Sequence, residues 1–149
     1  MWCIEIVIQE RILGGVLELD KRYQVYFTEN RVIVVKTSML AFTTLNMLGE
    51  ACKGVLRENY LEKSFPPDAR MKIFENIEKK KKFEAYRDQV SIIELRKPHM
   101  GLIRSKKGYI RIVRSDGKEI KIGFMREDLF DEFATLIYRF KPEALRIVS

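Results

Sequence analysis

Residues 109–124 read YIRIVRSDGKEIKIGF, in which two strand-like runs flank the polar sequence Ser-Asp-Gly-Lys. An Asp-Gly pair between two alternating runs is the strongest short-range signal for a β-hairpin. Alternate apolar residues such as Ile110 and Ile112 share one face of the first predicted strand, and the second strand repeats the pattern. The stretch therefore predicts an antiparallel hairpin with one buried face.

Strand character continues outward from this hairpin toward the N-terminus. Residues 90–97 predict a strand with apolar and polar residues on both faces, which suggests cover on both sides, and Pro98 closes it. Leu102–Arg104 predicts a short edge strand. Further upstream, short runs rich in β-branched and apolar residues predict four more strands: 3–8, 16–19, 23–28 and 32–35. The polar link Glu29-Asn30-Arg31 between the last two runs predicts a second hairpin.

The middle of the chain changes to a helical period. Apolar residues spaced four and three apart indicate one face of a helix that Ser38 caps: Ala41, Leu45, Leu48, Cys52 and Val55. Pro66-Pro67-Asp68 ends this helix and begins a second one, which ends in the basic sequence Lys79–Lys82. Met71, Phe74 and Ile77 share a stripe on this second helix, with Lys81 as a further candidate. We therefore expect residues 38–82 to form a helical insert between β segments.

The last predicted element is an amphipathic helix over about residues 127–139. Its apolar side chains form a wide stripe, and Glu127 and Asp128 lie in its first turn, where negative charge stabilises the helix dipole. Pro142 follows the helix and ends it.

Three segments carry a resemblance to a known family. Residues 26–34 (YFTENRVIV) are similar to the "strand, Thr-x-x-Arg, apolar strand" hairpin of prokaryotic pleckstrin-homology (PH)-like domains. Residues 83–97 resemble the segment after the helical insert of that family, and residues 129–133 (LFDEF) resemble the start of its closing helix. The similarity in the order of elements covers about residues 10–148.

The resemblance implies an α+β fold, mainly antiparallel β, in which residues 1–149 form a single domain. The expected structure is a PH-like barrel of about seven strands with a helical insert and a C-terminal capping helix. The family implies no enzymatic activity, frequent oligomers and diverse ligands. The basic motif with which eukaryotic members bind phosphoinositides has no match here, because Lys21-Arg22 lie beside Glu18 and Asp20.

Composition argues against most kinds of catalytic site. The chain has 149 residues, 46% of them hydrophobic and 33% charged, which suits one domain with a real core. His99 is its single histidine, and its two cysteines, Cys3 and Cys52, form no Cys-x-x-Cys unit. Gly14-Gly15 is not followed by the residues of a phosphate-binding loop. We expect a non-enzyme without cofactor or metal.

The start of the sequence and its hydropathy bear on location. Met1–Glu5 contain no basic leader, and no window approaches the roughly 18 apolar residues of a membrane-spanning helix. We therefore expect a cytoplasmic protein without a transmembrane segment.

Positive charge is concentrated in the middle third of the chain. The formal net charge is +7, whereas residues 70–121 alone carry sixteen Lys and Arg against seven Asp and Glu, which is 16 − 7 = +9. A basic patch of this kind binds anionic membrane surfaces or nucleic-acid phosphates, or it is a solubilising face. The candidate anion-binding residues are Lys79, Lys80, Lys81, Lys82, Arg104, Lys106, Lys107, Arg111, Arg114, Lys118 and Lys121.

The first predicted helix also has apolar side chains outside its main stripe. These candidate self-association residues are Met39, Leu40, Phe42 and Met47. A helix that is apolar around much of its circumference packs deeply against its own domain or meets another chain. A homo-oligomer assembled through the insert is the hypothesis that follows.

Taken together, these patterns predict a non-catalytic PH-like binding or scaffolding module that self-associates and has a protein or an anionic surface as partner. The alternative is a nucleic-acid-binding protein that uses the basic region 79–121, in which Tyr109 is the one obvious residue for base stacking.

Overall fold

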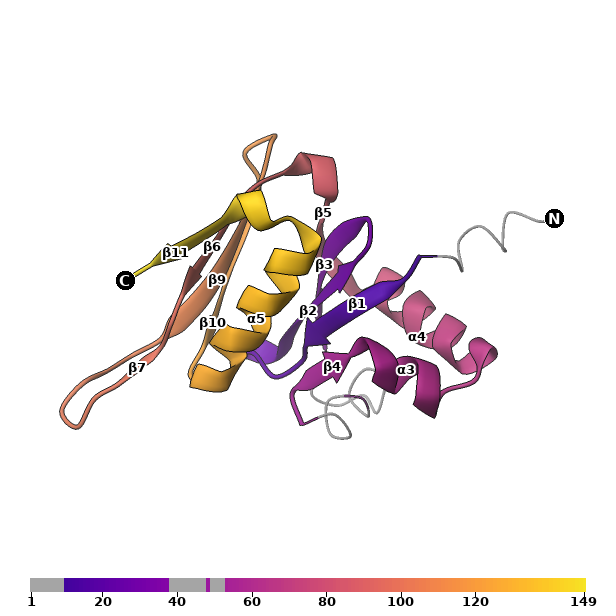
Figure 1. Ribbon diagram of the computed structural model, residues 1–149, viewed down its shortest axis with the longest axis horizontal. Helices are drawn as coiled ribbons and strands as arrows, with labels where there is room; N and C mark the ends of the chain where they lie inside the picture. The colour runs from indigo at the N-terminus through magenta and orange to yellow at the C-terminus, as the bar shows by residue number, and fades with distance from the viewer. Residues whose placement is uncertain (1–9, 38–47, 49–52) are drawn as a thin grey trace.

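The computed structural model describes residues 10–37, 48 and 53–149, and the structural statements below refer to these residues. The fold is α+β with mainly antiparallel sheets, as the sequence predicts (Figure 1). The larger sheet has five antiparallel strands in the order β4-β1-β2-β3-β5. Their bounds are Ile12–Val16 for β1, Tyr23–Thr28 for β2, Arg31–Lys36 for β3, Val55–Arg57 for β4 and Lys81–Tyr86 for β5.

The second sheet has four strands in the order β10-β9-β6-β11. Its strands are β6 (Val90–Arg96), β9 (Gly108–Arg114), β10 (Glu119–Phe124) and β11 (Leu145–Val148). The first three are antiparallel neighbours, whereas β11 pairs with β6 in parallel. Two short strands, β7 (His99–Met100) and β8 (Ser105–Lys106), form a separate hairpin between β6 and β9.

Helices cover the larger sheet on both sides (Figure 1). Helix α5 (Glu127–Phe140) contacts β1, β2 and β6 between the two sheets, whereas α3 (Glu58–Ser64) and α4 (Pro67–Lys80) lie on the opposite side of the larger sheet. Three single-turn helices complete the described chain: η1 (Asp20–Arg22), η2 (Arg87–Gln89) and η3 (Pro142–Ala144). No pairing among the described strands joins the two sheets, so both sheets are open.

The main core lies between the two sheets and is closed at one side by α5. Phe27 of β2 meets Phe140 of α5 edge to face with 5.5 Å between ring centroids, and Phe124 of β10 meets Phe133 at the same distance. Such pairs stabilise beyond the area that they bury. The predicted C-terminal helix is confirmed, because its apolar stripe is the face that fills this core.

A second core lies between the larger sheet and the helices α3 and α4. Tyr26 and Ile33 point to this side of β2 and β3, where they pack in one cluster with Ile73 and Ile77 of α4. Because both faces of the central strands are covered, their sequences are almost continuously apolar rather than alternating.

Both predicted hairpins are confirmed. In β9 and β10, Ile112 pairs with Ile120 and Ile110 with Ile122, while Gly117 in the turn has a φ of 91°. In the turn between β2 and β3, the backbone N–H groups of Asn30 and Arg31 donate to Thr28 Oγ1 at 3.1 and 3.0 Å.

The insert 38–82 differs from the sequence prediction. Val55, predicted on a helical stripe, lies in β4, which adds an antiparallel edge to β1. Gly54, with a φ of 91°, turns the chain toward β1, and its carbonyl accepts a hydrogen bond of 2.8 Å from Leu17 N–H just beyond that strand. Lys81 and Lys82 likewise belong to β5 and not to a helix. Ala41, Leu45 and Cys52 of that stripe lie outside the described residues, and Leu48 is buried.

Two further predictions change. Leu102–Arg104 is not an edge strand but the turn between β7 and β8. The strand predicted over 16–19 lies earlier in the chain, as β1, because Gly14 and Gly15 pair with β2; the strand predicted over 3–8 lies outside the described residues. After the helix that Pro142 ends as predicted, Leu145–Val148 form β11 beside β6, an element that the sequence analysis did not predict.

Candidate functional site

The eleven predicted anion-binding residues do not form one continuous patch. Lys79–Lys82 lie where α4 passes into β5 of the larger sheet, whereas the others belong to the second sheet and its hairpins. Within that sheet, Arg114 and Lys118 lie at the end of β9 opposite Lys106 and Lys107. Seven residues of strand β9 separate those two ends by roughly 20 Å at the usual rise per residue.

Besides Lys107, which pairs with Asp20, three of these cations are occupied by carboxylates. Lys81 Nζ lies 3.0 Å from Glu78 and 2.9 Å from Glu84, and the Arg111 guanidinium donates to both oxygens of Glu119 at 2.7 and 3.1 Å. Arg114 binds both oxygens of Asp116 at 3.0 and 2.8 Å, and this contact lowers the pKa of Asp116 to about 2. These three side chains are therefore poorly placed to bind an external anion.

Tyr109, the expected stacking residue for nucleic acid, is also engaged. The Arg96 guanidinium lies 4.6 Å and Lys121 Nζ 4.2 Å from the centroid of its ring. Its hydroxyl donates to Glu94 Oε1 at 2.6 Å, and this hydrogen bond raises the pKa of Tyr109. Because cations from both neighbouring strands contact this ring, the arrangement disfavours base stacking on Tyr109.

The β7–β8 hairpin is the described feature that stands furthest from the body of the molecule (Figure 1). We call residues 97–107 the apical hairpin. Its base is firmly held: Arg96 Nε and Nη2 donate to the Lys107 carbonyl oxygen at 3.1 and 2.8 Å. Gly108 allows β6 and β9 to approach here, since a Cβ on it would lie 2.5 Å from the Arg96 oxygen and 2.6 Å from Pro98 Cδ.

The base of the apical hairpin also contacts the loop between β1 and β2. Lys107 Nζ lies 2.5 Å from Asp20 Oδ2 in η1. Arg22 of η1 is itself fixed, because its carbonyl accepts hydrogen bonds from Thr37 N (3.1 Å) and Thr37 Oγ1 (3.2 Å). This packing brings the exposed residues Lys21 and Arg22 to the same end of the molecule as the hairpin.

The apex of the hairpin is apolar and fully exposed. His99 pairs with Lys106 and Met100 with Ser105, and the Gly101 N–H donates to the Arg104 carbonyl oxygen at 3.0 Å. The two residues between that last pair, Leu102 and Ile103, have side chains 107% and 99% exposed. A Cβ at position 101 would lie 2.3 Å from the Arg104 oxygen, so the tight turn requires glycine there.

Positive charge flanks this apex along the hairpin and gathers at its base. Residues 96–107 contain five Lys and Arg and no Asp or Glu. Five exposed cations at this end have no ion pair with the described residues; we call them the basic collar: Lys21, Arg22, Lys97, Arg104 and Lys106. The apical hairpin with the basic collar is our candidate functional site, and it combines two chemistries, unpaired positive charge and exposed apolar surface.

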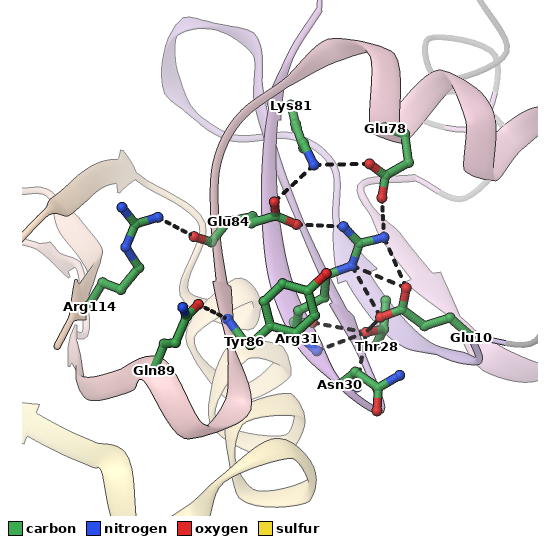
Figure 2. A network of polar contacts seen from close by, with 10 residues as sticks. All are labelled: Glu10, Thr28, Asn30, Arg31, Glu78, Lys81, Glu84, Tyr86, Gln89 and Arg114. Atoms are coloured by element: carbon green, nitrogen blue, oxygen red, sulfur yellow. Dashed lines mark hydrogen bonds and ion pairs between the residues drawn. The ribbon is translucent and has the colours of Figure 1, made fainter. Parts of the chain in front are cut away.

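A second polar cluster surrounds Arg31 and serves the fold (Figure 2). The Arg31 side chain is only 7% exposed and forms ion pairs with Glu10, Glu78 and Glu84. Burial works to lower the pKa of Arg31, but the hydrogen bonds from these three carboxylates outweigh burial and raise it. The cluster thereby joins β3 to α4 and β5, and its carboxylates are committed to Arg31 and Lys81.

The remaining candidates give no site. Met39, Leu40, Phe42 and Met47 lie outside the described residues, and His99 is an exposed residue of β7. Within residues 10–37, 48 and 53–149, no group of three metal-ligating side chains is clustered to hold a metal. Over the same residues, the helices are too short or too polar to cross a bilayer.

Sequence reasoning missed Met100, Leu102, Ile103 and the cations of η1. A signal for the first three was present, because Gly101 and two large apolar residues interrupt a stretch otherwise rich in Lys and Arg. The position of Lys21 and Arg22 near the apical hairpin follows only from the tertiary contact between Asp20 and Lys107.

No protein-family model, curated protein or solved structure matches the chain.

Proposed function

We propose that this chain is a non-catalytic PH-like binding module that docks on an anionic surface through the apical hairpin and the basic collar. One observation carries the proposal: five exposed cations without a carboxylate partner in the described chain lie at one end of the molecule. Each Lys or Arg close to an anionic bilayer contributes about 1 kcal/mol, so such a group supports weak, salt-sensitive binding.

The order of the strands supports the PH-like class. Strands β1, β2, β3 and β5 form a four-stranded antiparallel meander around the insert, and β6, β9 and β10 form a three-stranded one. Helix α5 follows directly and fills the side between the two sheets. The resemblance implies about seven strands, a helical insert and a closing helix, and these two meanders supply seven strands. The strands β4, β7, β8 and β11 are additional to that plan.

Binding of nucleic acid is the second candidate, and the geometry favours it less. The basic region 79–121 is divided between two sheets, several of its cations are paired, and the ring of Tyr109 is covered. Phosphate contacts alone give affinity without base recognition. Because the same cations can bind nucleic acid and an anionic lipid surface, the experiment must compare these two ligands directly.

The test is binding to vesicles of phosphatidylcholine with phosphatidylserine, to phosphatidylcholine alone, and to RNA, each at low and high salt. We expect salt-sensitive retention on the anionic vesicles that exceeds retention on RNA. The double variant R104E/K106E should weaken vesicle binding at least about tenfold, because it reverses two charges of the basic collar.

The matched control is K79E/K82E, which makes the same change in net charge at two exposed lysines away from the basic collar, one at the end of α4 and one in β5. It should bind the vesicles nearly as well as the parent chain. Equal losses in both variants would mean that net charge, and not the basic collar, drives binding. No binding to anionic vesicles at low salt would overturn the proposed function.

Self-association through the insert stays a prediction, and its test is the solution mass. A multimer that persists at high salt and dissociates when Met39, Phe42 and Met47 are changed to Ser would support it. A monomer of 17.6 kDa at all salt concentrations would contradict it.

A further inference from the structure

Local folding does not explain the apolar apex of the apical hairpin. Tight turns favour Gly, Asn and Asp, whose backbones adopt the required angles, whereas β-branched Ile is disfavoured in such turns. Yet the two apical residues are Leu102 and Ile103, with Met100 beside them at 55% exposure. Large apolar side chains that are fully exposed and adjacent to one another mark a contact surface when they serve no core.

We propose that the apical hairpin inserts Leu102 and Ile103 into the interfacial layer of an anionic phospholipid bilayer. The inference rests on the proposed function and deepens it, because it names the anionic surface as a lipid bilayer and assigns the apolar contact. In this arrangement, Arg104 and Lys106 lie at the level of the headgroup phosphates.

The length of the apical hairpin matches the depth of the interfacial layer of a bilayer. At about 3.3 Å per residue, the apex lies roughly 10 Å beyond the pair formed by His99 and Lys106. Interfacial protein segments bury their apolar groups about 5–10 Å into the boundary between headgroups and acyl chains. The apex therefore reaches the acyl boundary while Lys106 stays among the phosphates and the base of the hairpin stays in water.

The base of the hairpin is held in place before the apex binds a bilayer. The bonds from Arg96 to the Lys107 carbonyl and the close packing at Gly108 hold its base. Less conformational freedom is therefore lost when the apex binds. No acidic residue lies in the segment 96–107 that would enter the negatively charged headgroup layer.

Other partners use only part of this surface. Nucleic-acid phosphates would engage the cations and leave Leu102 and Ile103 in water. A pocket on another protein, or on a second copy of this chain, would bury the apex without needing unpaired cations beside it. An anionic bilayer offers phosphates to the cations and an apolar layer to Leu102 and Ile103, and it needs no shaped pocket. We therefore favour a bilayer as the partner.

The first test measures the depth of the apex. Trp2 is the only tryptophan of the sequence, so W2F removes the background signal and I103W places a reporter at the apex. We expect a blue shift of the emission on anionic vesicles and strong quenching by lipids brominated in the acyl chain. The control reporter is W2F/K118W, at the exposed turn at the other end of β9, which should show neither effect.

The second test separates insertion from electrostatic docking. L102S/I103S should weaken binding to anionic vesicles by about 10- to 100-fold, because two apolar side chains no longer leave water. L102I/I103L keeps the apolar surface and should bind like the parent chain. Both variants should unfold at the parent temperature, since the two side chains touch no core.

The outcomes distinguish the two proposals. Parental vesicle binding by L102S/I103S together with an unquenched reporter would overturn insertion and leave electrostatic docking intact. No vesicle binding by the parent chain would overturn both. A blue shift without vesicles that grows with protein concentration would place the apex in a second copy, and a blue shift with RNA alone would place it on nucleic acid; either result overturns bilayer insertion.

Discussion

Arg31 Nη1 lies 2.5 Å from Glu84 Oε2, which joins β3 to β5 across the larger sheet (Figure 2). The residue opposite Arg31 in the β3–β5 register is Tyr86, whose ring centroid lies 5.8 Å from the guanidinium carbon. With Glu10 before β1 and Glu78 on α4, the same side chain thus contacts three parts of the chain outside its own strand. Arg31 is therefore a structural centre, distinct from the exposed cations of the apical hairpin.

Replacing Arg31 should strongly destabilise the fold. Arg31→Met leaves Glu10, Glu78 and Glu84 close together with only Lys81 to offset them. Removing one partner of a buried ion pair costs about 3–5 kcal/mol, a large part of a typical stability. Urea unfolding of the variant should show this loss.

The control for this variant is Arg57→Met. Arg57 pairs with Glu132 at 2.5 Å, but its side chain is 65% exposed, so its loss should cost at most about 1 kcal/mol. Similar losses in both variants would contradict the central role of Arg31.

The same cluster makes stability depend on acid pH. Burial works to raise the pKa of Glu78 and Glu84, but hydrogen bonds from Arg31 and Lys81 outweigh burial and lower the pKa of both below the ordinary value for a glutamate. The folded state therefore binds these protons less tightly than the unfolded state. Their contribution to stability is complete above about pH 4.5 and is lost as the pH falls through the folded values.

Urea unfolding between about pH 7 and pH 3 measures this dependence. The variant E78Q/E84Q should be less stable at neutral pH and should lose less of its remaining stability in acid than the parent chain. Glu75→Gln, at an exposed position of α4, should keep the parental slope. A parental acid slope in E78Q/E84Q would show that other carboxyl groups control it.

Adding a methyl group at Gly108 should disturb the base of the apical hairpin. Its Cβ would meet backbone oxygen and the proline ring at under 3 Å, neither of which can move away easily. Gly108→Ala should therefore cost about 1–3 kcal/mol and weaken vesicle binding. Gly117→Ala meets no atom within 4 Å and carries only the strain of its φ of 91°, about 1 kcal/mol, so vesicle binding should not change. Unchanged stability in Gly108→Ala would contradict the close packing.

Removing the carboxylate that pairs with Lys107 should strengthen docking. Asp20→Asn frees Lys107 and adds one positive charge beside the basic collar. One more cation near an anionic bilayer is worth about 1 kcal/mol, or about fivefold in affinity, at low salt and little at high salt. Asp116→Asn makes the same charge change at the opposite end of β9 and should leave vesicle binding near the parental value. An effect of Asp116→Asn as large as that of Asp20→Asn would indicate long-range charge alone.

The sequence by itself determined the elements whose signal is local. The Asp116-Gly117 turn fixes its hairpin because few dipeptides adopt those backbone angles, and the apolar stripe of α5 indicates its buried face through its period of 3.6 residues. It also showed that the cations are concentrated in one third of the chain.

Only the tertiary structure decided what depends on distant neighbours. Val55 lies in a strand because β1 offered a free edge, and Leu102 and Ile103 form an exposed apex because none of the described elements covers them. Neighbouring cations differ for the same reason: Arg111 pairs with Glu119, whereas Lys106 has no ion pair with the described residues. Pairing across the fold, not spacing along the chain, determines which charges remain available to a partner.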